Sequence, residues 1–124
     1  MARATATAIA AGRLGLGTVA LAAPGVPLGL WVGDEDASRP VARLLARALG
    51  GRDVALASGA LAALARGRPL QPWVVAGVLA DVGDMAATLV AWRALPRARR
   101  WTVVCLAAGA ALAGAAVAPS CDRR

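Results

Sequence analysis

The stretch WVVAGVLADVGDMAATLVAW, residues 73–92, decides the fold of this chain. As a helix, its 20 residues are long enough to cross the roughly 30 Å hydrocarbon core of a bilayer. Asp81 and Asp84 lie near its middle, where a carboxylate is costly unless it meets a partner or a water-filled cavity. Arg13, Arg52 and Asp53 are the candidate partners. The stretch therefore predicts a membrane helix within a small bundle that has a polar centre.

Composition extends this conclusion to the whole chain. Of its 124 residues, 59% are hydrophobic, and the mean hydropathy is +0.62. A soluble domain of this size cannot bury so much apolar surface, so membrane is the expected class. The length allows one domain, residues 1–124. The bias toward Ala, Gly and Arg is typical of a high-GC bacterial genome, and we expect a multi-pass protein of the bacterial inner membrane.

The composition excludes the catalytic chemistries that depend on histidine. The sequence has no histidine, which excludes Ser-His and Cys-His pairs and histidine metal sites. No second catalytic constellation accompanies the aspartates. At helical rise, Cys105 and Cys121 would lie more than about 20 Å apart, so we expect no disulfide, with Cys105 buried in the last helix. We predict no enzymatic activity, no catalytic residue, no metal and no cofactor.

Four stretches have membrane length, which predicts an all-α transmembrane bundle of four spans, with three as the alternative. The spans are residues 4–23, 41–65, 73–95 and 101–118. Prolines bound them at Pro24, Pro72, Pro96 and Pro119. After Pro24, a further proline and glycines predict an irregular segment.

Two of these stretches have a second interpretation. Gly50 and Gly51 could break residues 41–65, leaving a basic stripe on a short amphipathic helix in the headgroup layer, formed by Arg39, Arg43 and Arg47. The remaining residues would then span only roughly 21 Å, so we favour an unbroken span. Residues 1–22 could instead form a signal peptide, but the apolar run before Arg13 is atypical of a signal's charged region.

Tryptophans mark the ends of the predicted spans. An indole at the membrane interface can bury its ring and keep its N–H in water. Four interfacial anchors are therefore predicted: Trp31, Trp73, Trp92 and Trp101.

The charged residues inside the spans are predicted to pair. Asp81 and Asp84 share a helix face with Gly77 and Thr88. Counting back from a hairpin turn at residues 68–71 places Arg52 near the depth of Asp84. With Arg13 from the first span, the interior then holds three positive and three negative charges. These are Arg13, Arg47, Arg52, Asp53, Asp81 and Asp84.

This network has two functional interpretations. In the first, neutral pairing fixes the register of the helices and nothing moves through them. In the alternative, a desolvated carboxylate of the Asp81 and Asp84 pair takes up a proton or cation during small-solute transport or channel conduction. The first is preferred.

The net charge of +7 points to lipid headgroups rather than to nucleic acid as the partner. The arginines are spread over helix ends and loops, without an aromatic stacking surface between them. With five arginines at one membrane face and six at the other, orientation is weakly specified. The dense loop 93–100 favours cytoplasmic placement of that face, and the weak bias permits a homo-oligomer such as an antiparallel dimer.

Small residues predict close helix packing. Residues 15–20 match a loose dinucleotide fingerprint, G-x-G-x-x-A, but no strand precedes them. In a membrane helix such residues let a neighbour approach, and Ala110 with Gly114 offers a similar surface in the last span.

The pattern ARLLARALGGRD at residues 42–53, ADVGD at 80–84 and a basic loop before the last apolar stretch resembles small four-helix bacterial membrane proteins of unknown function. It is also distantly similar to the DoxX-like group in length and helix number. Small multidrug transporters and fluoride channels share the size, but their signature residues are missing here. The resemblance implies a fold and no specific activity.

Overall fold

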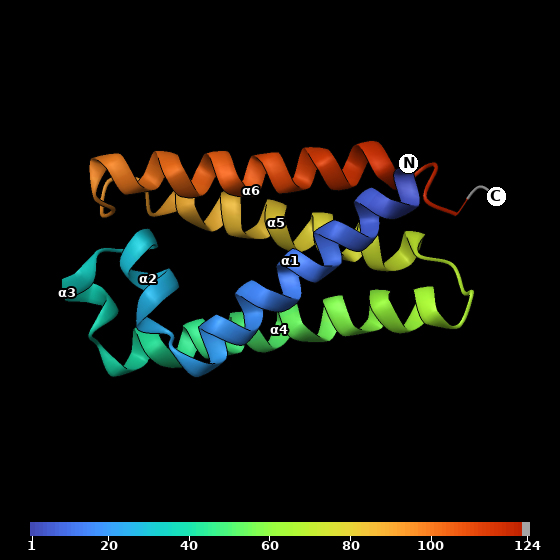
Figure 1. Ribbon diagram of the computed structural model, residues 1–124. Helices are drawn as coiled ribbons and strands as arrows, with labels where there is room; N and C mark the ends of the chain where they lie inside the picture. Colours follow the sequence, from blue (N-terminus) through green and yellow to red (C-terminus); the bar gives the residue numbers. More distant parts are fainter. Residues whose placement is uncertain (123–124) are drawn as a thin grey trace.

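The computed structural model describes residues 1–122, and this range contains helices joined by turns, with no strand (Figure 1). The helices are α1 (Ala2–Ala22), α2 (Gly25–Trp31), α3 (Asp34–Ala37), α4 (Pro40–Ala65), α5 (Gln71–Val90) and α6 (Arg97–Val117). Four of them, α1, α4, α5 and α6, have 20 to 26 residues each and are long and apolar enough to cross a membrane. The predicted four-span helical bundle is therefore confirmed.

The long helices alternate in direction. α5 and α6 run side by side. In the view of Figure 1, α1 crosses diagonally in front of the bundle, from the end of α6 to α4. The N-terminus, the α4–α5 turn and the end of α6 lie at one end of the bundle. α2, α3 and the α5–α6 connection lie at the other, here called the α2/α3 end. The core is built mainly from alanines, so the helices pack closely.

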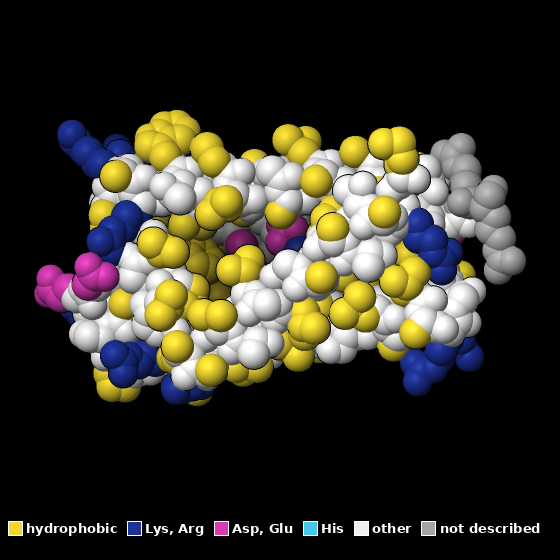
Figure 2. Space-filling view, in the orientation of Figure 1, with side chains coloured by type: hydrophobic (Ala, Val, Ile, Leu, Met, Phe, Trp, Pro, Cys, Tyr) yellow, Lys and Arg dark blue, Asp and Glu magenta, His cyan; other side chains and the backbone are white. Residues whose placement is uncertain are grey.

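On the face shown in Figure 2, the outer surface is apolar along the length of the bundle and charged at both ends. Long side chains such as Leu16, Leu79, Leu106 and Leu112 face outward, each more than 60% exposed. A continuous exposed apolar surface of this kind suits lipid as the surrounding solvent.

Glycines set the distance between α1 and α4. A Cβ at Gly50 would lie 2.7 Å from the carbonyl oxygen of Gly17 and 2.8 Å from the Cβ of Ala20. A Cβ at Gly17 would lie 2.8 Å from the carbonyl oxygen of Gly50. The predicted small-residue contact in the first span is thus an α1–α4 crossing. On α6, Gly114 makes room for Val78 of α5 in the same way.

The favoured interpretation of residues 41–65 as one unbroken helix is confirmed, and the alternative of a break at Gly50 and Gly51 is wrong, because α4 continues through both residues. The contact of Gly50 with α1 explains why glycine is placed inside a helix. The prediction of an irregular segment after Pro24 is also wrong, since α2 and α3 occupy it. Pro27 lies in the first turn of α2, where the missing N–H removes no intrahelical hydrogen bond.

The ends of the last two spans differ from the prediction. α5 ends at Val90 instead of residue 95, and turns follow it. α6 begins directly after Pro96, so the basic residues at positions 97–100 form its first turn. One of them, Arg99, donates a hydrogen bond to the carbonyl oxygen of Gly29 and pairs with Asp34 at 3.2 Å. These contacts tie α6 to α2 and α3.

The two cysteines are both free, as expected, but the predicted burial of Cys105 is wrong. Cys105 is exposed on the outer face of α6, whereas Cys121 is fully buried. The chain turns back after α6 and packs Cys121 against Leu70 and neighbouring alanines. Asp122 then accepts hydrogen bonds from the backbone N–H groups of Leu70 and Gln71, at 2.6 and 3.0 Å. The end of the chain thereby caps the beginning of α5.

Candidate functional site

Five charged side chains from three helices meet near the middle of the bundle, and we call them the charged network. Arg13 belongs to α1, Arg52 and Asp53 to α4, and Asp81 and Asp84 to α5. Each lies within about one turn of the midpoint of its helix, the depth at which a bilayer is least polar. The structure therefore brings together the five residues singled out in the sequence.

Arg13 connects α1 to both of the other charged helices. Its Nη1 donates to Oδ1 of Asp53 at 2.9 Å, and its Nη2 lies 2.7 and 2.6 Å from the two carboxylate oxygens of Asp81. Nη2 also donates to the carbonyl oxygen of Gly77 at 3.3 Å. Only 11% of each side chain of the Arg13–Asp81 pair is exposed. One guanidinium group thus joins three helices.

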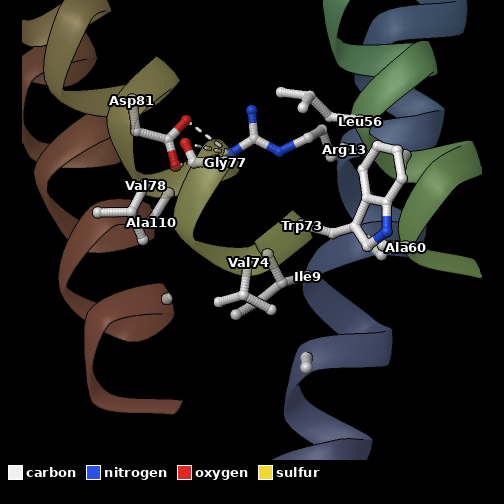
Figure 3. Close-up of a pocket in the computed structure, with 14 residues that line it drawn as sticks. Ile9, Arg13, Leu56, Ala60, Trp73, Val74, Gly77, Val78, Asp81 and Ala110 are labelled. Carbon is white, nitrogen blue, oxygen red and sulfur yellow. Dashed lines mark hydrogen bonds and ion pairs between the residues drawn. The ribbon is translucent and has the colours of Figure 1, made fainter. Parts of the chain in front are cut away.

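Gly77 lies directly beside the guanidinium group of Arg13. A Cβ at this position would lie 3.4 Å from a guanidinium nitrogen of Arg13. This is an ordinary van der Waals distance, so a methyl group would also fit, and the guanidinium group lies beside the backbone of α5 between Gly77 and Asp81 (Figure 3). Arg13 thus covers the Gly77 and Asp81 part of the predicted polar face of this helix.

Arg52 forms the second half of the network. Its Nη1 and Nη2 donate to the two oxygens of Asp84 at 2.9 and 2.8 Å, the two-pronged geometry that favours arginine over lysine. Nη2 and Nε also lie 3.1 and 3.3 Å from Oδ1 of Asp53. Asp53 is therefore shared by both arginines, and the pairs form one continuous chain of contacts from Asp81 to Asp84.

The charge balance differs from the prediction. Arg47 was counted in the interior, but it is exposed, and its Nε donates to the carbonyl oxygen of Leu21 at 3.2 Å. The charged network consequently contains two guanidinium groups and three carboxylates. With all groups ionised, one negative charge is left without a compensating cation.

A small pocket adjoins the network. It has a volume of about 30 Å³, which is room for about two water molecules. Arg13 and Asp81 form its polar wall, and apolar residues of the four long helices, with Trp73, form the rest (Figure 3). Acidic atoms are also visible at the bottom of a hollow in the apolar face beside α1 (Figure 2). Asp53 and Asp84 keep 21% and 22% of their side chains exposed, so the network is not sealed.

A polar contact that the sequence did not reveal extends the network toward α2. The indole N–H of Trp31 donates to the hydroxyl oxygen of Thr88 at 3.2 Å. The Thr88 hydroxyl donates to the carbonyl oxygen of Asp84, one turn earlier, at 2.7 Å. The indole N–H of Trp31 therefore has a protein partner instead of the predicted water. The placement of Thr88 on the face of Asp84 was the only sequence signal for this contact.

The other tryptophans lie near the two ends of the bundle, and their role as interfacial anchors stays a prediction. Trp73 is in the first turn of α5, with its ring over Gly59 of α4. Trp92 and Trp101 meet at the opposite end in an edge-to-face contact, with ring centroids 4.9 Å apart. The guanidinium carbon of Arg100 lies 4.5 Å from the ring centroid of Trp92.

Within residues 1–122, no group of three or more histidine, cysteine or acidic side chains is arranged to hold a metal ion. No protein-family model, curated protein or solved structure matches the chain. The resemblance to DoxX-like proteins stays a prediction. The function of the chain is therefore inferred from the geometry of its own residues.

Proposed function

We propose that this chain is a multi-pass integral membrane protein whose charged network fixes the packing of α1, α4 and α5. The observation that carries the proposal is the position of Arg13, which bonds to carboxylates on two other helices at 2.6 to 2.9 Å. Pairs buried this deeply add little stability over well-packed apolar residues, but breaking one is strongly destabilising. The network thus fixes the register of three helices whose other contacts are mainly between small apolar side chains.

The proposed location is a bacterial inner membrane. Four helices long and apolar enough to span support membrane insertion, and the Ala-, Gly- and Arg-rich composition supports a high-GC bacterial source. The proposed role is structural association in the bilayer, without catalysis.

The Arg52–Asp84 pair provides the test. Asp84→Asn leaves Arg52 with only Asp53 as a carboxylate partner, so we expect a lower yield of folded protein in detergent. The double substitution Arg52→Asp with Asp84→Arg restores opposite charges across the same helices and should recover part of that yield. Size-exclusion chromatography measures the folded fraction. Asp36→Asn, in the exposed pair with Arg39, is the control and should change little. If Asp84→Asn leaves the yield unchanged, the packing role is wrong.

A second candidate function is proton- or cation-coupled movement of a small solute through the bundle, using Asp81 and Asp84. The excess of one carboxylate over the guanidinium groups favours it, because a bound proton or cation would complete the charge balance. The partial exposure of Asp84 offers a route from outside.

A flux assay distinguishes the two functions. Protein reconstituted in liposomes containing a pH-sensitive dye is compared with empty liposomes, with and without an imposed pH gradient. Coupled movement predicts proton flux that Asp84→Asn reduces while Leu112→Ala, on the outer face of α6, leaves it unchanged. The packing function predicts no flux above that of empty liposomes.

A further inference from the structure

A second site lies at the α2/α3 end, away from the charged network. Arg43 and Arg47, one turn apart on α4, border a depression of about 330 Å³. Its opposite wall is the turn from α1 into α2, residues 22–26. This volume is within the range of roughly 300–1,000 Å³ that is common for small-molecule sites. No acidic side chain lines it.

Each of the two arginines donates a hydrogen bond through its Nε, while its Nη1 and Nη2 make none to the described residues. The Nε of Arg43 donates to the carbonyl oxygen of Ala37 at 3.2 Å, and the Nε of Arg47 donates to that of Leu21 at the same distance. Among residues 1–122, neither side chain has a hydrogen bond through Nη1 or Nη2 or an ion pair with an acid. Each guanidinium group is thus positioned by the backbone while its Nη atoms remain available for a planar, two-pronged contact with an oxyanion.

The depth of the depression identifies the source of that oxyanion. Counting back from Ala65, the last 20 residues of α4, 46–65, cover about 30 Å, the thickness of the hydrocarbon core. With Ala65 taken as one edge of the core, Arg47 lies at the other edge and Arg43 just outside it. This is the layer in which phospholipid phosphates lie, while Leu44 and Leu45 are exposed beside the arginines.

We propose that Arg43, Arg47 and the turn 22–26 form a binding site for the headgroup phosphate of an anionic glycerophospholipid. A lipid headgroup and a free phosphate would both place a phosphate oxyanion between the two guanidinium groups. The lipid supplies an acyl chain that can continue along the apolar outer surface, which a free phosphate cannot. This site rests on the proposed membrane placement but not on the charged network, so the Arg52–Asp84 swap and the experiment below can fail independently.

The test is lipid binding to the full chain in neutral detergent, measured by native mass spectrometry. Dioleoylphosphatidylglycerol is titrated against wild type, Arg43→Gln/Arg47→Gln and a matched control, Arg66→Gln/Arg68→Gln, which removes two exposed arginines at the opposite end. We expect the first variant to lose roughly 25-fold in affinity, about fivefold for each of the two arginines near the surface. The control should retain the affinity of the wild type.

Three further measurements decide the chemistry. Arg43→Lys/Arg47→Lys keeps the charge but not the planar fork, so it should fall between the wild type and the glutamine variant. Dioleoylphosphatidylcholine should bind less tightly than the anionic lipid. The anionic lipid should also raise the thermal midpoint of the wild type, a result that does not depend on how well a variant folds.

The proposal is overturned if both glutamine variants lose affinity equally, which would indicate general attraction to a basic protein. It is also overturned if the Arg43→Gln/Arg47→Gln variant, shown to be folded by circular dichroism, binds the lipid as wild type does. Inorganic phosphate that competes with the lipid at equal concentration would assign the site to a soluble anion and reject the lipid.

Discussion

Oδ1 of Asp53 accepts hydrogen bonds from both Arg13 and Arg52, which makes the charged network one unit instead of two separate pairs. Such sharing raises the cost of losing either arginine, because the loss changes the environment of more than one carboxylate. The effect should be largest at Arg13, where two carboxylates on two helices depend on a single side chain.

Arg13→Gln should therefore destabilise the protein strongly, by about 3–5 kcal/mol, the cost of breaking a buried ion pair. The matched control is Arg47→Gln. This arginine is exposed and has no ion pair among the described residues, so its replacement should cost less than about 1 kcal/mol. Unfolding of both variants in a detergent titration with a denaturant gives the comparison. Equal losses would show that Arg13 contributes no more than a surface arginine.

Asp122 predicts a pH dependence at the end of the chain. The backbone N–H groups of Leu70 and Gln71 stabilise its carboxylate and hold its pKa below the ordinary value. A carboxyl group whose pKa is lower in the folded state contributes stability above the unfolded pKa of about 3.9, and that contribution is lost as pH falls through the folded pKa. At pH 7, Asp122→Asn should thus have a lower thermal midpoint than the wild type. Below pH 3 the difference between the two midpoints should become smaller. A difference between the two proteins that stays constant from pH 7 to pH 3 would contradict this assignment.

Sequence spacing predicted some of these contacts because the constant rise per residue of a helix converts a sequence position into a depth in the bundle. The Arg52–Asp84 pair followed from counting back along two antiparallel helices from their turn. Arg47 could not be placed the same way, since a long side chain near a helix end can extend toward water as easily as inward. The contact of Trp31 with Thr88 depends on how the α2 segment folds against α5, which local spacing does not encode.

At the level of helices, close approach between α1 and α4 depends on which glycine faces the partner. Gly50 and Gly51 are adjacent in sequence, yet only Gly50 lies against α1, and a Cβ on Gly51 would meet nothing within 4 Å. The double glycine suggested a helix break from the sequence, because glycine lowers helix propensity. The tertiary contact of Gly50 with α1 is stronger than that local preference.

Gly50→Ala should therefore cost about 1–3 kcal/mol, because the added methyl group meets backbone atoms of α1 that cannot rotate away. Gly51→Ala is the control. Its methyl group faces open space, so the higher helix propensity of alanine should leave stability unchanged or raise it by up to about 1 kcal/mol. Thermal unfolding monitored by circular dichroism measures both. Similar behaviour of the two variants would contradict the crossing contact.

For the whole molecule, the correction at Arg47 also changes the expected orientation. Once Arg47 is assigned to the headgroup layer, the α2/α3 end carries seven arginines and the opposite end five. The seven are Arg39, Arg43, Arg47, Arg93, Arg97, Arg99 and Arg100. The five are Arg3, Arg66 and Arg68, together with Arg123 and Arg124, which lie outside the described residues and are counted here only because they follow Asp122 in the sequence. The arginine-rich end is normally cytoplasmic, so the structure strengthens the weak bias in the sequence.

We accordingly expect both termini outside the cytoplasm, with alkaline phosphatase fused to the carboxyl end active and a fluorescent protein at the same position dark. Arg93→Gln/Arg97→Gln equalises the two ends at five arginines each. Neither side chain has a hydrogen bond or ion pair in the described residues, so the fold should persist while the population becomes mixed and both reporters give signal. Arg66→Gln/Arg68→Gln removes charge from the other end and should leave only the phosphatase active.

Two results for the wild type would contradict this orientation. If both reporters are active, the chain inserts in two directions, which would favour the antiparallel dimer. If only the fluorescent fusion gives signal, the assigned orientation is reversed.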